Sequence, residues 1–171
     1  SGDFTGLNVT MPYKKDVIPY LDELSDVAQQ LGAVNTIVRR SDGSLIGHNT
    51  DFFGFRTMVA DSDLSVSGKK VLVLGSGGAS NTAVAVLETL GAEVVVISRK
   101  GENHYGNLHL HADASVIVNT TPVGMYPLVG VSPVDLAWFP HLEGVLDIVY
   151  NPARTQLLLE AEKRGIVAMN G

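Results

Sequence analysis

The sequence contains no cysteine among its 171 residues. This absence excludes disulfides, thiolate metal ligands and a cysteine nucleophile, and it is compatible with a reducing compartment. The chain also lacks an excess of basic residues, since its formal net charge is −6. An acidic chain has no general attraction for nucleic acid or for an anionic membrane, so any anionic ligand has to be held by a local cluster of positive charge.

The sequence shows no signal peptide, no apolar run as long as a membrane span, no long repeat and no low-complexity block. We therefore expect a cytoplasmic protein that has neither nucleic acid nor a membrane as its partner. The composition is typical of a globular protein, with 45% hydrophobic residues, 18% charged residues and 18 glycines that indicate many tight turns. The length fits one domain, or one domain and part of another.

Residues 1–60 differ in texture from the rest of the chain. Their expected elements are, in order, a strand over 6–10, a helix over 16–31, strands over 36–39 and 45–48, and a helix over 51–60. The two strands in the middle are joined by Ser41-Asp42-Gly43-Ser44, which is a strong hairpin signal. The polar residues 61–68 are expected to form a linker or loop.

From residue 69 onward, strands alternate with helices. We expect strands over 70–74, 93–97, 114–119, 144–148 and 166–169, with helices over 79–90 and 155–164. Several of these strands are continuous Val, Ile and Leu runs, which indicates a parallel sheet that is covered on both faces. The expected fold class is therefore α/β, with a Rossmann-like, doubly wound parallel sheet.

The turn after the first of these strands reads Gly75-Ser-Gly-Gly-Ala-Ser80. Gly75 would permit the tight turn, and Gly77 would let the backbone approach a pyrophosphate at the N-terminus of the next helix. Ser80 stands where a dinucleotide-binding motif usually has its third glycine, so the match is incomplete. The alternative is a purely structural turn between a strand and a helix.

The next strand ends in Ser98-Arg99-Lys100, where an NAD site would usually have a carboxylate. A carboxylate at this place would repel a 2′-phosphate, whereas the guanidinium, ammonium and hydroxyl groups of these residues can donate hydrogen bonds to one. The three residues therefore favour NADP over NAD as the cofactor. The alternative is that Arg99 and Lys100 are merely solvated residues at the end of a strand.

Candidate groups for proton transfer lie in the first region. Lys14 follows a strand and a proline, and Asp51 stands at the start of a helix. Taken singly, a lysine is more often a surface residue, and an aspartate at this place is more often a helix cap. The five histidines have no carboxylate or cysteine partners at a recognisable ligand spacing, so we expect no metal.

The ordered set of motifs resembles the shikimate dehydrogenase family. The motifs are Asn8-Val-Thr-Met-Pro-Tyr-Lys14, Gly32-Ala-Val-Asn-Thr36, Asn49-Thr-Asp51, Gly75-Ser-Gly-Gly-Ala79, Asn119-Thr-Thr-Pro-Val-Gly-Met125, Asp147-Ile-Val-Tyr150 with Pro152 and Thr155, and Asn170-Gly171. The resemblance covers nearly the whole chain in the family's order. It implies the reversible, NADP-linked reduction of 3-dehydroshikimate to shikimate, a step in aromatic amino-acid biosynthesis.

The resemblance also implies roles for individual residues. Lys14 and Asp51 match the family's catalytic pair, and Thr10, Asn35 and Tyr150 match substrate-binding positions. The positions implied for the cofactor are Gly75, Gly77, Gly78 and Ala79 at the phosphates, Ser98, Arg99 and Lys100 at the 2′-phosphate, and Thr121, Ile148 and Gly171 on the nicotinamide side. Residues 1–60 would then be a partial substrate-binding and catalytic domain that ends in a linker helix, and residues 61–171 an NADP-binding domain.

The sequence departs from the family's pattern at both ends. Nothing corresponds to the serine pair that grips the substrate carboxylate in the family, and nothing follows Asn170-Gly171, where the family has a helix with a substrate-binding glutamine. We therefore expect a chain that is truncated at both ends. The alternatives are a quinate or aminoshikimate dehydrogenase of the same family, or an NADP-binding fragment without activity. The oligomeric state does not follow from the sequence.

Overall fold

The structure is a computed structural model that describes residues 4–10 and 12–171. The chain divides into two compact units, the first up to Gly54 and the second from Phe55 to Gly171. This boundary falls inside helix α2 (Asp51–Asp61), earlier than the expected boundary after residue 60. Phe55, Met58 and Val59 on the later turns of α2 are buried, and they belong to the second unit. The assignment of a function to each unit stays a prediction.

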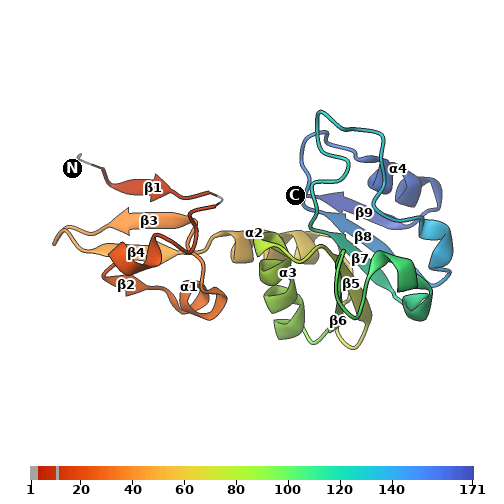
Figure 1. Cartoon of the computed structure of the whole chain (residues 1–171), viewed down its shortest axis with the longest axis horizontal. Helices are drawn as coiled ribbons and strands as arrows, with labels where there is room; N and C mark the ends of the chain where they lie inside the picture. Colours follow the sequence, from red (N-terminus) through yellow and green to blue (C-terminus); the bar gives the residue numbers. More distant parts are fainter. Residues whose placement is uncertain (1–3, 11) are drawn as a thin grey trace. The chain divides into compact units, whose positions relative to one another are not determined.

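The first unit is built on a four-stranded sheet with the strand order β1-β3-β4-β2 (Figure 1). Its elements are β1 (Gly6–Asn8), the 3₁₀ helix η1 (Ile18–Tyr20), β2 (Glu23–Leu24), α1 (Asp26–Leu31), β3 (Thr36–Arg39) and β4 (Leu45–His48). β3 is antiparallel to both β1 and β4, whereas β2 runs parallel to β4. The buried core consists of Ala28, Val34 and Ile37, with partly buried side chains around them.

The expected hairpin of β3 and β4 is confirmed at both strands, but the expected continuous helix over residues 16–31 is wrong. Pro19 lies in the short η1 helix, and the chain then extends so that Glu23 and Leu24 pair with β4. Helix α1 starts only after Ser25, whose side chain accepts a hydrogen bond from the backbone N–H of Ala28. The structure of this segment is therefore determined by strand pairing and by a specific N-cap, and not by the helical spacing of its apolar residues.

The second unit contains a five-stranded, all-parallel sheet with the order β6-β5-β7-β8-β9, which confirms the expected α/β fold class. Its strands are β5 (Lys70–Leu74), β6 (Glu93–Ile97), β7 (Val116–Asn119), β8 (Gly144–Asp147) and β9 (Val167–Asn170). Its helices besides α2 are α3 (Gly78–Thr89), η2 (Tyr105–His111), η3 (Leu136–Trp138) and α4 (Gln156–Lys163). The two 3₁₀ helices, η2 and η3, are not among the elements expected from the sequence.

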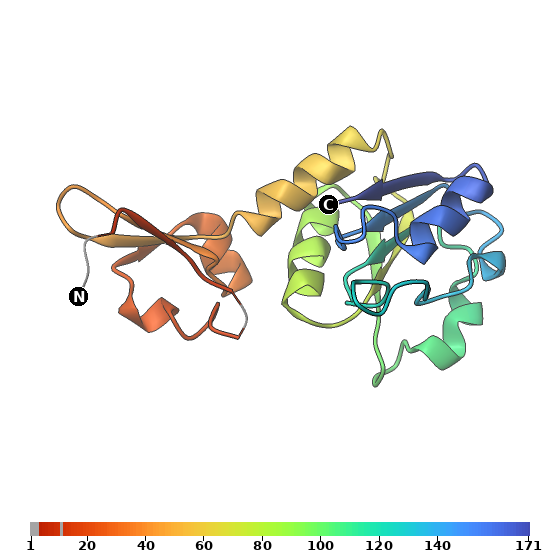
Figure 2. The ribbon, with the colours of Figure 1, turned by 90° about the horizontal axis from the view of Figure 1, so that it is seen from above.

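The parallel sheet is covered on both faces, as its apolar strands predict. Leu72 and Leu74 of β5 belong to a buried cluster that includes the buried leucines of α4. Val71 and Val73 alternate with them along the strand, so they point to the other face, and they are also completely buried. Helix α3 packs on β5 and β6, and Figure 2 shows α3 and α4 on opposite faces of the sheet. No helix in the described part of the chain is long and apolar enough to cross a membrane.

Candidate active site and nucleotide-binding edge

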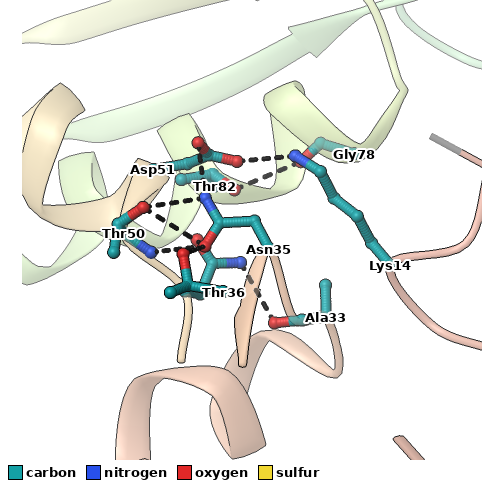
Figure 3. Close-up of polar contacts among 9 residues, drawn as sticks. Lys14, Ala33, Asn35, Thr36, Thr50, Asp51, Gly78 and Thr82 are labelled. Atoms are coloured by element: carbon teal, nitrogen blue, oxygen red, sulfur yellow. Dashed lines mark hydrogen bonds and ion pairs between the residues drawn. The ribbon is translucent and has the colours of Figure 1, made fainter. Parts of the chain in front are cut away.

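An ion pair between Lys14 and Asp51 forms the centre of the candidate active site in the first unit. Lys14 Nζ lies 2.7 Å from Asp51 Oδ2 (Figure 3), and the two side chains are 28% and 46% exposed. The carbonyl of Lys14 accepts a hydrogen bond from Val34 N at 2.8 Å, which fixes the loop after β1 beside the start of β3. Because both charged groups reach solvent, a small polar ligand can contact them. Met11, in the same loop, lies outside the described residues.

The other oxygen of Asp51 is held by Asn35, which immediately precedes β3. Asn35 Nδ2 donates hydrogen bonds to Asp51 Oδ1 at 2.8 Å and to Thr50 Oγ1 at 2.9 Å. Asn35 Oδ1 accepts hydrogen bonds from Thr50 N at 2.9 Å and from Thr36 Oγ1 at 3.0 Å. The carboxylate is therefore gripped from two directions, by Lys14 on one oxygen and by Asn35 on the other.

The two other candidate substrate-binding residues are exposed. Thr10 follows β1, and its carbonyl accepts a hydrogen bond from Tyr13 N at 2.9 Å. Tyr150 follows β8 in the second unit, and 75% of its surface is exposed. The structure thus brings Lys14, Asn35 and Asp51 into direct contact within the first unit, and it places Tyr150 in the other unit.

The turn from β5 to α3 requires a glycine at position 75. Gly75 has φ 107°, and a Cβ at this position would lie 2.9 Å from Thr120 Oγ1 and 3.0 Å from Thr121 Cγ2. Thr120 in turn donates a hydrogen bond to the carbonyl of Leu74 at 2.6 Å, which fixes the end of β5. The close approach of β5 and β7 at this point leaves no room for a side chain.

The N-terminus of α3 has the form of an anion site. Gly77 is the N-cap residue, and no side chain caps the helix there. Both Gly77 and Gly78 are exposed, and a Cβ added to either one would meet no atom of the chain within 4 Å. The N-cap and the first residue of this 12-residue helix thus have open space where side chains would stand, next to Ala79. Such an uncapped, glycine-lined helix start fits the pyrophosphate of a dinucleotide.

The basic residues at the end of β6 are exposed beside this turn. Gly75 N donates a hydrogen bond to the carbonyl of Ile97 at 2.8 Å, so the turn and the end of β6 are adjacent. Arg99 and Lys100 are exposed just beyond, whereas the Ser98 hydroxyl donates a hydrogen bond to the Lys100 carbonyl. The single hydroxyl hydrogen of Ser98 is therefore already used in this hydrogen bond. Arg99 and Lys100 remain as the side chains that can donate hydrogen bonds to a phosphate.

Tyr105 was not a candidate from the sequence, although it lies near the basic strand end. Burial raises the pKa of Tyr105, and the positive charge of Arg99 partly offsets this shift. Tyr105 also packs against the core cluster of the second unit. Arg99 therefore lies near the partly buried phenol of Tyr105. The sequence did not predict this proximity, because Tyr105 lies in helix η2, which was not expected.

Three further candidate residues lie along the carboxyl ends of the parallel strands. Thr121 Oγ1 donates a hydrogen bond to Asn119 Oδ1 at 2.7 Å, just past β7. Gly171 N donates to the carbonyl of Asp147 at 2.9 Å, and a Cβ on Gly171 would lie 3.5 Å from the carbonyl oxygen of Ile148. In the order β6-β5-β7-β8-β9, the direction of winding changes between β5 and β7, and ligands of such sheets bind at this switch point.

A buried carboxylate supports this edge of the sheet. Asp147 is completely buried, and its oxygens accept hydrogen bonds from Thr155 Oγ1 at 2.7 Å, Val149 N at 3.0 Å and Asn119 Nδ2 at 3.0 Å. Burial raises the pKa of Asp147, and these hydrogen bonds partly offset that shift. Thr155 is also the N-cap of α4. Asp147 therefore ties the ends of β7 and β8 to the start of α4.

Comparisons with known proteins agree with these observations. Residues 1–37 match the family model described as the shikimate dehydrogenase substrate binding domain. The chain is 38% identical to the shikimate dehydrogenase (NADP(+)) of Caldicellulosiruptor bescii, with 99% of this chain and 65% of the relative covered. It is 37% identical to the enzyme of the same name from Carboxydothermus hydrogenoformans, with 99% of this chain and 67% of the relative covered. The chain thus spans about two thirds of the length of these relatives.

Solved structures show the same likeness. A chorismate mutase/shikimate 5-dehydrogenase fusion protein from Clostridium acetobutylicum matches with a TM-score of 0.90 at 36% identity, over 98% of this chain and 65% of that one. Shikimate 5-dehydrogenase from Thermus thermophilus, in complex with NADP(H) and shikimate, matches with 0.83 at 32%, over 98% and 66%. Quinate dehydrogenase from Corynebacterium glutamicum, in complex with NAD, matches with 0.86 at 32%, over 97% and 66%.

Proposed function

The chain belongs to the shikimate dehydrogenase family, and from this membership we propose that the protein reduces 3-dehydroshikimate reversibly to shikimate with NADPH. The observation that carries the proposal is the Lys14–Asp51 ion pair at 2.7 Å, exposed to solvent and braced by Asn35. A ketone that accepts a hydride needs a proton donor at its oxygen, and this pair is suited to that task. We also propose that the protein acts in the cytoplasm on a small-molecule substrate.

Lys14 is the proton donor in this proposal. Hydride addition to the carbonyl carbon builds negative charge on the oxygen, which a nearby ammonium stabilises before it transfers a proton to that oxygen. Asp51 orients the ammonium through its contact with Lys14 Nζ. In the oxidation direction Lys14, in its neutral form, accepts the hydroxyl proton. Thr10, Asn35 and Tyr150 are proposed to contact the substrate's polar groups.

The proposed cofactor residues fit NADP better than NAD. Bound NADPH supplies the hydride. The open helix start at Gly77, Gly78 and Ala79 suits the pyrophosphate, and Gly75 permits the turn that leads to it. Arg99 and Lys100 offer positive charge for a 2′-phosphate, with Ser98 beside them. Thr121, Ile148 and Gly171 are proposed to line the nicotinamide side at the edge of the sheet.

Quinate oxidation is the second candidate function, and the likeness to a quinate dehydrogenase in complex with NAD favours it. Quinate and shikimate are both hydroxylated carbocyclic acids, so the Lys14–Asp51 pair serves either substrate. The two candidates differ in the expected cofactor. The exposed Arg99 and Lys100 favour a phosphorylated nucleotide, whereas the structure of the quinate dehydrogenase is a complex with NAD.

A panel of four assays tests the proposal. Shikimate and quinate are each offered with NADP+ and with NAD+ to the full-length protein, and nucleotide reduction is followed by absorbance. We expect the highest catalytic efficiency for shikimate with NADP+, and its loss in the Lys14→Ala variant. A higher catalytic efficiency for quinate would show that quinate, and not shikimate, is the substrate. Nucleotide binding without turnover of either acid would show that the protein binds the cofactor but is not an enzyme.

A further inference from the structure

Thr50 lies between β4 and α2, next to the candidate catalytic residue Asp51. Its carbonyl accepts a hydrogen bond from Gly54 N at 3.0 Å, so its backbone is fixed by the first turn of α2. Asn35 is fixed separately, because Asn35 N donates to the carbonyl of His48 at 3.0 Å and its carbonyl accepts from Val9 N at 2.8 Å. The backbone is therefore fixed at both residues, and the side chains of Asn35 and Thr50 are in contact with each other (Figure 3).

The contacts of the Asn35 amide determine which way it faces. Thr50 N, a backbone N–H group that can only donate, lies 2.9 Å from Asn35 Oδ1. Asp51 Oδ1, which in the ionised carboxylate can only accept, lies 2.8 Å from Asn35 Nδ2. These two partners fix the oxygen and the nitrogen of the amide independently, and both assign the same orientation.

Both ends of the Asn35 side-chain amide have hydrogen-bond partners inside the protein. Its two N–H groups donate to Asp51 Oδ1 and to Thr50 Oγ1, the latter at 2.9 Å. Its carbonyl oxygen already accepts from Thr50 N and from Thr36 Oγ1. Thr50 thus contacts both ends of the amide, and the amide contacts the one oxygen of Asp51 that Lys14 does not hold.

We propose that Thr50 is a positioning residue that acts through Asn35: it fixes the Asn35 amide, and the amide holds Asp51 Oδ1 so that Oδ2 faces Lys14. The kinetic part of this inference rests on the proposed dehydrogenase function, whereas the geometric part does not. Without the Thr50 hydroxyl, one Asn35 N–H group loses its acceptor and the amide is held by fewer contacts. Asp51 would then orient the Lys14 ammonium less well, which lowers turnover.

Three variants of the full-length protein test the role. Thr50→Val removes the hydroxyl at nearly constant volume, Thr50→Ser keeps it, and Thr57→Val makes the same change at an exposed position further along α2. A neutral hydrogen bond of ordinary strength corresponds to about a threefold to tenfold fall in kcat for Thr50→Val. The KM for NADP+ should not change, Thr50→Ser should restore kcat, and Thr57→Val should match the wild type.

Nuclear magnetic resonance of the Asn35 side-chain amide gives a second readout that needs no activity. We expect one of its two N–H proton signals to move in Thr50→Val and neither to move in Thr57→Val. Unchanged Asn35 signals, unchanged kcat, or a loss of kcat that Thr50→Ser does not restore would each overturn the positioning role. If the wild type turned over none of the substrates, the proposed function would fail, and the Asn35 signals alone would decide whether Thr50 fixes the amide.

Discussion

The two units of the chain build their candidate sites in different ways. In the second unit, β5, β7 and β8 are buried almost throughout, and a large cluster of buried apolar residues packs against one face of the sheet. In the first unit, all three residues of β1 are exposed, and the cluster of buried residues in the described part of the unit is the small one of Ala28, Val34 and Ile37. The second unit thus has a scaffold that holds backbone turns in place, whereas the first relies on polar side chains that hold one another.

This contrast explains which residues matter in each unit. The candidate nucleotide site depends on backbone shape at Gly75 and Gly77, which the buried strands support. The candidate catalytic site depends on the contacts among Lys14, Asn35 and Asp51, which are exposed or half-buried. Substitutions at Gly75, at Gly77 and in the buried strands of the second unit should therefore act on stability or on nucleotide binding, and substitutions at the catalytic side chains of the first should act on turnover.

The largest effect is expected for Lys14→Ala in the full-length protein. Removing a positioned proton donor lowers kcat by about 10²–10⁴. The affinity for NADP+ should stay near that of the wild type, because no proposed nucleotide contact is changed. Steady-state kinetics and nucleotide titration check both parts, with Lys15→Ala as the control at an exposed neighbouring lysine. Normal turnover in Lys14→Ala would remove Lys14 from the mechanism.

Truncation of a core leucine sharpens the comparison of the two scaffolds. Leu157 on α4 is completely buried, so Leu157→Ala should lower the free energy of unfolding by about 2–5 kcal/mol. Leu7 on β1 is 45% exposed, and Leu7→Ala should change it by about 0.5 kcal/mol. Urea unfolding followed by far-ultraviolet circular dichroism reports on both units and measures the two losses, and the fluorescence of Trp138, the single tryptophan, identifies the transition of the second unit. Equal losses for the two variants would contradict the contrast in burial.

Arg99→Asp tests the choice of cofactor. The substitution removes a charged hydrogen-bond donor and adds repulsion, and losing such a contact costs about 1.5–3 kcal/mol. The Kd for NADP+ should therefore rise by roughly 10-fold to 150-fold, with a much smaller change for NAD+. Isothermal titration with both nucleotides measures the difference, and Arg56→Asp on α2 is the matched control. An equal change for the two nucleotides would show that Arg99 does not contact the 2′-phosphate.

The smallest effect concerns the pH dependence of stability at Asp147. Burial raises the pKa of Asp147 above its ordinary value, so the folded state binds this proton more tightly than the unfolded state does. The stability that comes from this group is present below the ordinary pKa of aspartate and is lost as the pH rises through the raised value. Asp147→Asn stays neutral and can still contact Thr155, Val149 and Asn119.

The difference in unfolding free energy between Asp147→Asn and the wild type should therefore move in favour of the variant as the pH rises from the acidic range toward neutrality. Urea unfolding at a series of pH values measures this trend. Asp113→Asn is an informative comparison, because Lys70 lowers the pKa of Asp113 and the trend should have the opposite sign. A flat or reversed trend for Asp147→Asn would refute the assignment.

The sequence predicted the fold where local signals agreed with long-range contacts. β5 and β6 form over the expected residues because each is a continuous apolar run followed by polar or glycine residues. The hairpin of β3 and β4 forms because Asp42 and Gly43 suit a tight turn. The prediction of one helix over residues 16–31 was wrong because residues 23–24 pair with β4. This strand is distant in the sequence, and helical spacing does not reveal the pairing.

The candidate site was predictable only in part, for a similar reason. The motifs identified Lys14 and Asp51 as candidates, although the two residues are separated by 37 positions in the sequence. The roles of Thr50 and Asp147 were not visible, because they depend on side-chain directions. Asn119, Asp147 and Thr155 meet only because β7, β8 and the start of α4 converge at one edge of the sheet.

The most direct test of this division of roles is a double-mutant cycle of Lys14→Ala and Arg99→Asp, with kcat at saturating NADP+ and the Kd for NADP+ measured for each protein. Lys14→Ala should lower kcat and leave Kd unchanged, Arg99→Asp should raise Kd and leave kcat unchanged, and the double variant should show both effects in full. A large rise in Kd from Lys14→Ala, or a fall in saturated kcat from Arg99→Asp as large as that from Lys14→Ala, would contradict this division of roles.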